Sequence, residues 1–137
     1  MRVLAIDYGD ARTGIAISDI MGMIVGQTTV IHSRNAQKTA TEIARIVKES
    51  GANKLVMGFP RNMDGSEGPR ADLYREFAAL VEETTGMPVV LWDERRTTVE
   101  AHNILSQHNY HGKKRKNTVD AVAASLILEG YLAFRKR

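Results

Sequence analysis

The chain has 137 residues, of which 43% are apolar and 26% charged, as expected for one globular domain. It contains no cysteine, which excludes disulfides, thiolate metal sites and a cysteine nucleophile and fits a reducing cytosol. No apolar run approaches membrane-spanning length, and the first residues do not resemble a signal peptide. We therefore expect a cytoplasmic protein without membrane contact.

The net charge of +3 is unevenly distributed along the chain. Residues 1–107 carry 12 basic and 14 acidic side chains, whereas residues 108–137 carry 7 basic and 2 acidic ones. The basic excess lies in two runs, Lys113-Lys114-Arg115-Lys116 and Arg135-Lys136-Arg137. Such runs favour a polyanionic partner, although a solvated end explains the second run more simply.

The first stretch, residues 1–19, predicts two strands joined by a tight turn. Apolar runs at Val3–Ile6 and Gly14–Ser18 flank a turn that contains two glycines and two acids. Asp7 is therefore expected where a buried strand ends, although it could also cap the turn's own amides. A β-branched run at Met23–Ile31 predicts a third strand and hence an antiparallel meander.

The middle of the chain alternates between helical and extended patterns. Residues 35–50 have apolar positions at helical spacing, and Lys54–Phe59 predicts a fourth strand. A loop rich in glycine and proline, residues 58–70, follows at a strand end, where open α/β sheets bind ligands. The next helix is predicted over residues 69–85, and its expected buried stripe is Leu73, Phe77, Leu80 and Val81.

A fifth strand is predicted at Pro88–Trp92, followed at once by Asp93 and Glu94. The pattern Thr97-x-x-Glu100 matches a capping box, so a helix is expected from there to about His108. If the first and fifth strands are parallel neighbours, Asp7 and Glu94 should lie side by side. Strand alternation directs Asp93 away from Glu94, so Asp93 is kept only as a reserve candidate.

The last part of the chain predicts a basic loop at Asn109–Asn117 and a helix from Val119 to about Arg135. Asp120 falls in the first turn of that helix, where complementing the helix dipole is its simplest role. The small side chains around it would let the helix approach a sheet closely. That approach would bring Asp120 to the strand ends that carry the other acids.

Four motifs in this order carry a resemblance that covers essentially the whole chain. They are Asp7-Tyr8-Gly9 with Arg12, Gly14 and Ser18-Asp19; Gly58-Phe59-Pro60 with Asn62 and Asp64-Gly65-Ser66; Asp93-Glu94-Arg95 with Thr97-Thr98; and Asp120 with Ala121, Ala123 and Ala124. The chain resembles the YqgF-type family, relatives of the RuvC Holliday-junction resolvases. The resemblance implies one α/β domain over residues 1–137 with a ribonuclease H-like fold, a mixed five-stranded sheet with helices on both faces.

The resemblance also implies a metal-dependent nuclease that processes pre-16S ribosomal RNA at its 5′ end. It implies that Asp7, Glu94 and Asp120 are the catalytic acids and the ligands of Mg²⁺ or Mn²⁺. Two divalent metals held by carboxylates are suited to phosphodiester hydrolysis, and these hard cations prefer oxygen ligands. The candidate nucleic-acid contacts are Arg12, Asn62, Lys113, Lys114, Arg115 and Lys116.

Two other functions stay open at this point. The protein could resolve four-way DNA junctions, which requires a dimer, or it could be a nucleic-acid-binding ribosome or transcription factor with a vestigial site. We expect a monomer or a weak homodimer. The four histidines, His32, His102, His108 and His111, lack a metal-binding spacing and are interpreted as surface residues.

Overall fold

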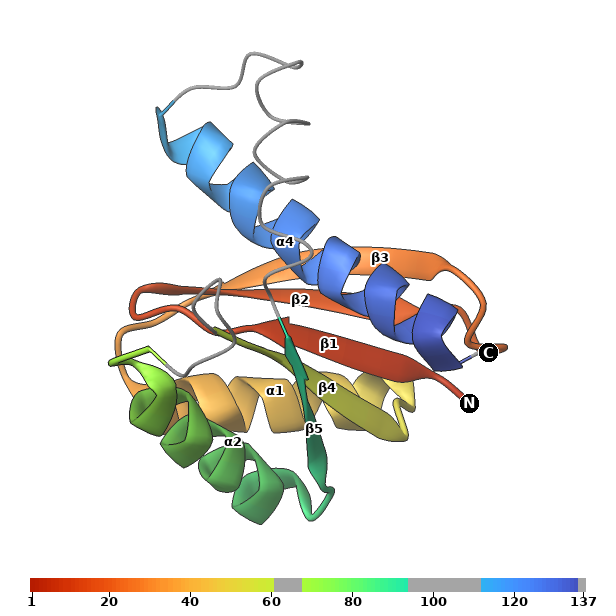
Figure 1. Cartoon of the computed structure of the whole chain (residues 1–137), viewed down its shortest axis with the longest axis horizontal. Coiled ribbons are helices and arrows are strands. Elements are labelled where there is room, and N and C mark those ends of the chain that lie inside the picture. Colours follow the sequence, from red (N-terminus) through yellow and green to blue (C-terminus); the bar gives the residue numbers. More distant parts are fainter. Residues whose placement is uncertain (61–67, 94–111, 136–137) are drawn as a thin grey trace.

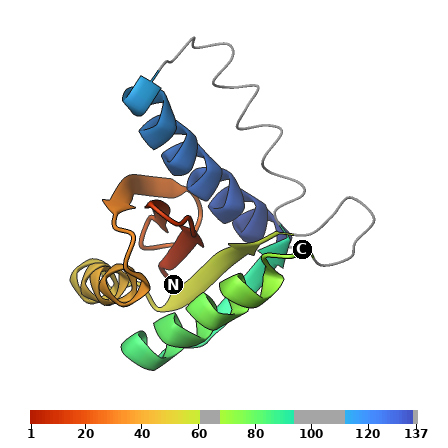
Figure 2. The same cartoon turned by 90° about the vertical axis from the view of Figure 1, so that its left-hand side faces the viewer.

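The computed structural model describes residues 1–60, 68–93 and 112–135, and for residues 112–118 only the helical backbone. Five strands form one mixed sheet in the order β3-β2-β1-β4-β5. Helices α1 and α2 cover one face of the sheet, and α4 crosses the other (Figures 1 and 2). The expected α/β architecture, a five-stranded mixed sheet with helices on both faces, is therefore confirmed.

The described elements follow the predicted order along the chain. They are β1 (Val3–Asp7), β2 (Arg12–Ser18), β3 (Val25–His32), α1 (Ala36–Ser50), β4 (Lys54–Phe59), α2 (Ala71–Thr85), β5 (Val89–Asp93) and α4 (Gly112–Arg135). The Asn35 side chain caps α1 by accepting a hydrogen bond from the Lys38 amide. The same helix ends at Gly51, whose φ of 73° is a left-handed conformation that suits glycine.

The condition under which Asp7 and Glu94 would lie side by side is not met. β1 pairs antiparallel with β2 and parallel with β4, and β5 pairs with β4 on its far side. The first and fifth strands are thus parallel but separated by β4. Two strand spacings of about 4.8 Å each separate their backbones by roughly 10 Å. Asp7 therefore has no neighbour on β5 in the sheet, and the premise that would place it beside Glu94 does not hold.

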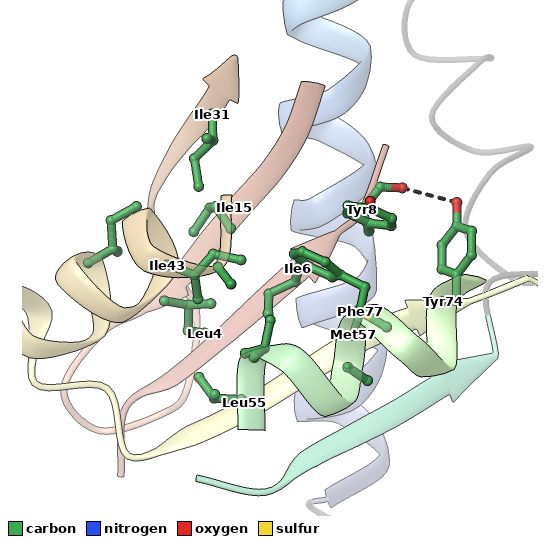
Figure 3. Close-up of a cluster of buried hydrophobic side chains, with 14 of the residues drawn as sticks. Leu4, Ile6, Tyr8, Ile15, Ile31, Ile43, Leu55, Met57, Tyr74 and Phe77 are labelled. Carbon is green, nitrogen blue, oxygen red and sulfur yellow. Dashed lines mark hydrogen bonds between the residues drawn. The ribbon is translucent and has the colours of Figure 1, made fainter. Parts of the chain in front are cut away.

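The face covered by α1 and α2 contains large apolar side chains. Leu4 and Ile6 of β1, Ile15 of β2, Met57 of β4 and Ile43 of α1 belong to one cluster of buried side chains on this face (Figure 3). The predicted buried stripe of α2 is corrected in one position, since Leu73 is 37% exposed. Tyr74 and Ala78 are buried instead, beside Phe77 and Val81, because the inward face of α2 is rotated relative to the predicted stripe.

The face covered by α4 contains smaller side chains. Val3 and Ala5 of β1 and Ala16 of β2 pack there against the helix. Ala124, Ile127, Leu128 and Leu132 of α4 are buried in this contact. Trp92 of β5 packs edge-on against Tyr131 and Phe134 of the same helix, with ring centroids 6.0 and 5.6 Å away.

The boundary of the last helix also differs from the prediction. α4 begins at Gly112, so the basic run Lys113–Lys116 is helical and does not belong to a loop. Strong helix formers such as lysine and arginine favour this extension once the helix is anchored further on. The helix predicted from Thr97 to His108 lies outside the described residues. None of the helices that the structure describes combines the length and apolar character needed to cross a bilayer.

Candidate active site

Asp7 is the last residue of β1, at the end of the sheet where the chain enters the turn Tyr8–Ala11. Val3 and Ala5 of the same strand face α4, and side chains alternate along a strand, so Asp7 also lies on the α4 face. Its register partner on β2 is Gly14. The rigid sheet therefore fixes Asp7 at one strand end, and on the face that α4 covers.

Gly14 brings α4 to this strand end. A Cβ atom built on Gly14 would overlap the Asp120 carbonyl oxygen, lie 2.8 Å from the Asp120 carbonyl carbon and 3.3 Å from Ala124 Cβ. Only glycine permits this approach of helix backbone to strand. Because Gly14 is the register partner of Asp7, the structure brings the backbones of Asp7 and Asp120 to the same place on one face of the sheet.

Arg12 connects the start of β2 to α4 through an ion pair. Its Nε donates to Asp120 Oδ2 at 2.8 Å, and the Asp120 side chain is only 16% exposed. Burial raises the pKa of the Asp120 carboxyl above its ordinary value, although the Arg12 guanidinium opposes that shift. The charged form of this partly buried carboxylate is therefore stabilised by a nearby cation. In this structure the cation is the Arg12 guanidinium.

His32 is a residue of this region that the sequence interpretation set aside. It ends β3 directly opposite Arg12 in the β2–β3 register, and its positive form would lower the pKa of Asp120. Its exposure agrees with the predicted surface position. The register of the β2–β3 hairpin could have predicted that His32 lies beside Arg12, since these are the first residue of β2 and the last residue of β3.

The turn after Asp7 is fixed from the side of α2. Tyr74 of α2 donates its hydroxyl hydrogen to the Tyr8 carbonyl oxygen at 3.0 Å (Figure 3). Arg70, at the start of α2, binds the Asp10 carboxylate at 2.8 Å, which lowers the pKa of Asp10. The Ser33 amide donates to the Ala11 carbonyl at 3.1 Å. Neither α2 contact was predicted from sequence.

The other predicted site residues are placed less fully. Glu94 and Asn62 lie outside the described residues, and for Lys113, Lys114, Arg115 and Lys116 only the helical backbone is described. Asp93 pairs in register with buried Phe59, on the face opposite Trp92, so it does not share the face of Asp7. Within residues 1–60, 68–93 and 119–135, no three acidic or histidine side chains gather closely enough to hold a metal.

Comparison with known proteins assigns the chain to a family. Residues 1–134 match the family model described as "RuvX: Holliday junction resolvase". Two relatives named "Putative pre-16S rRNA nuclease" are similar over the full 137 residues. The one from Halothermothrix orenii is 40% identical and covered over 98% of its length; the one from Carboxydothermus hydrogenoformans is 41% identical and covered over 99%. The chain belongs to the RuvX family.

A solved structure supports the fold at lower sequence similarity. Thermus thermophilus RuvC in complex with a Holliday junction substrate matches with a TM-score of 0.60 and 12% identity, over 99% of this chain and 96% of that one. At this identity the likeness shows the fold alone. It confirms the predicted ribonuclease H-like fold, and the match to the family model and to the two relatives confirms the predicted family.

Proposed function

We propose that this protein is a metal-dependent nuclease that hydrolyses phosphodiester bonds of structured RNA and processes the 5′ end of pre-16S ribosomal RNA. The single observation that carries the proposal is the approach of Asp120 to Gly14, the register partner of Asp7. It supports a pair of carboxylates at one strand end. The names of the full-length relatives supply the RNA substrate.

The donor set suits a hard divalent cation. Asp7 and Asp120 offer carboxylate oxygens, the ligands that Mg²⁺ and Mn²⁺ prefer, and Asp120 is partly desolvated. We assign Asp7, Glu94 and Asp120 as catalytic acids and metal ligands, with Glu94 assigned from the sequence motif. Such metals, when bound, supply an activated water and stabilise the leaving oxygen.

The chain's own residues orient these groups and the substrate. Gly14 admits α4, the sheet fixes Asp7, and Arg12 holds the Asp120 carboxylate. A metal at these acids would compete with Arg12 for the Asp120 carboxylate. Arg12 would then be available to a phosphate, for which its fork of donors is well suited. Asn62 and the run Lys113–Lys116 are the other proposed nucleic-acid contacts, and the run begins α4 one to two turns before Asp120.

A second candidate is resolution of four-way DNA junctions, which the description of the family model favours. A resolvase must present two sites, whereas we expect a monomer or weak homodimer in the cytoplasm. A binding protein with a vestigial site is the third candidate, and the approach of Asp120 to the strand end that carries Asp7 favours the enzyme over it. Phosphate contacts carry no base or sugar information, so the substrate must be determined directly.

The test is metal-dependent cleavage of three substrates by one preparation: a pre-16S RNA fragment, a junction DNA and a single strand. We expect Mg²⁺- or Mn²⁺-dependent cleavage of the RNA, and complete loss of cleavage in Asp7→Asn with retained folding. Cleavage confined to the junction DNA would favour the second candidate. No cleavage of any substrate with either metal would contradict the proposal.

The proposed role of the basic run is tested by binding. Each cation that contacts a duplex phosphate contributes about 0.9 to the slope of log affinity against log salt. Replacing Lys113, Lys114, Arg115 and Lys116 by Ser should weaken RNA binding and flatten that slope, while single-turnover cleavage at saturating RNA stays near wild type. Unchanged affinity and slope would mean that the run does not contact the substrate.

A further inference from the structure

The turn Tyr8–Ala11, which begins directly after Asp7, is held by two contacts from the start of α2. The buried Tyr74 hydroxyl donates to the Tyr8 carbonyl at 3.0 Å, and Arg70 binds Asp10 at 2.8 Å. The Arg70 guanidinium also lies over the Tyr74 ring, 5.9 Å from its centroid. α2 thus holds the turn at both of these positions.

The two contacts differ in how strongly they constrain the turn. The Arg70 and Asp10 side chains are 49% and 59% exposed, and ion pairs between such exposed groups stabilise little. Tyr8 and Tyr74 are each 9% exposed, and a buried carbonyl that loses its donor cannot easily recover one from water. The Tyr74 hydroxyl is therefore the dominant constraint.

Aromatic packing also holds Tyr8 in place through its side chain. The Tyr8 ring stacks on Phe77, with centroids 3.8 Å apart and an interplanar angle of 11°, and meets Tyr74 edge-on at 5.6 Å (Figure 3). Tyr8 is thereby anchored on the α1 and α2 face. Successive residues at a strand end point to opposite faces, so anchoring Tyr8 there directs Asp7 toward α4.

We propose that Tyr74 is a positioning residue for Asp7: its hydroxyl holds the Tyr8 carbonyl and thereby fixes the carboxylate that precedes it. The inference depends on the proposed function, because Asp7 is a metal ligand only under that function. Tyr74 would act through the Tyr8 carbonyl and not as a metal ligand. Groups that orient metal ligands from outside commonly contribute about 10–100-fold to metal affinity or activity.

The first test compares Tyr74→Phe with Tyr131→Phe in the full chain. Both replacements keep the ring and remove one hydroxyl, and Tyr131 lies on the α4 face, away from the turn. Mn²⁺ binding is measured by calorimetry on each folded protein. We expect the affinity of Tyr74→Phe to fall about tenfold and that of Tyr131→Phe to stay within twofold of wild type.

The second test needs no metal. The Ser33 amide donates to the Ala11 carbonyl at the end of the turn, and the Gly51 amide donates to Val47 at the far end of α1. Hydrogen exchange of the two amides is followed by NMR. Tyr74→Phe should accelerate exchange at Ser33 relative to Gly51, because the turn loses its anchor, whereas global destabilisation would accelerate both.

The outcomes separate this inference from the proposed function. Faster Ser33 exchange with weaker Mn²⁺ binding supports the positioning role. Unchanged Ser33 exchange overturns it, and so does faster exchange with unchanged Mn²⁺ affinity. Failure of the wild-type protein to bind Mn²⁺ contradicts the proposed function, and with it the assignment of Asp7 as the ligand that Tyr74 positions.

Discussion

The two faces of the sheet are packed with side chains of different size. The α1 and α2 face buries Leu4, Ile6 and Met57, whereas the α4 face of the same strands buries Val3, Ala5 and Val56. Large side chains hold a helix away from the sheet, and small ones let it approach. The difference indicates that the α1 and α2 face supplies most of the apolar stabilisation. The α4 face determines how closely α4 brings Asp120 to Asp7.

Outside the proposed catalytic acids, Gly14→Ala should have the largest effect on cleavage, because the added Cβ would overlap the Asp120 carbonyl and displace α4. We expect single-turnover cleavage to fall about 100-fold, as for other small displacements of catalytic groups. Overpacking should also lower the free energy of unfolding by about 1–3 kcal/mol.

Gly51→Ala is the matched control for that loss of stability. Gly51 ends α1 at a φ of 73° with open space around its Cβ position, so alanine there strains only the backbone, by roughly 1–2 kcal/mol. Its cleavage rate should stay near wild type. An equal loss of rate in both variants would show that stability, and not the approach of α4, governs activity.

Ile43→Ala tests the other face. Ile43 is fully buried in α1, and its truncation should lower the free energy of unfolding by about 2–5 kcal/mol, measured by urea denaturation. The folded fraction should retain its cleavage rate, since the α4 face is untouched. A rate loss beyond the unfolded fraction would mean that both faces position the acids.

Asp120→Asn gives a smaller, pH-dependent effect in the metal-free protein. Burial raises the pKa of Asp120 in the folded state, so the folded protein binds its proton more tightly than the unfolded chain. The free energy of unfolding of the wild type should therefore fall relative to that of the variant as the pH rises. The fall begins near 3.8, the ordinary pKa of an aspartate, and is complete above the raised pKa of folded Asp120.

The measurement is urea denaturation at pH 3 and pH 7. The variant should equal wild type at the lower pH and match or exceed it at the higher, with cleavage abolished. A clearly less stable variant at pH 7 would show that the ion pair with Arg12 outweighs the cost of burying the carboxylate.

Arg45→Ser should have the smallest effect. Arg45 pairs with Glu42 and Glu49 along the exposed side of α1, and such pairs contribute about 0.5 kcal/mol each at most. Cleavage and RNA affinity should not change. A marked loss of RNA affinity would mean that the substrate path reaches α1, away from the acid-bearing end of the sheet.

Local patterns in the sequence predicted the elements well. A continuous apolar run identified β4 and a helical period identified α1, and the position of Asp7 after an apolar run placed it at a strand end. The small residues beside Asp120 predicted a close approach to the sheet, and Gly14 provides it. The role of Glu94 stays a prediction, because that residue lies outside the described part of the chain.

What the sequence could not predict depends on contacts between distant residues. The insertion of β4 between β1 and β5 follows from long-range pairing, which no local pattern encodes. The Tyr74 contact with Tyr8 spans 66 positions. The sequence favoured Leu73 as a buried residue on hydrophobicity alone, whereas the inward face of α2 buries Tyr74, whose hydroxyl donates to the Tyr8 carbonyl.

Trp92 is the single tryptophan of the chain, and it lies between β5 and α4. Gly130 of α4 leaves room for the indole, since a Cβ there would lie 3.2 Å from its Nε1 atom. Indole fluorescence therefore reports on the seating of α4 against β5. Its emission should shift to longer wavelength in Gly14→Ala and stay near wild type in folded Ile43→Ala, so one optical signal distinguishes a displaced helix from a weakened core.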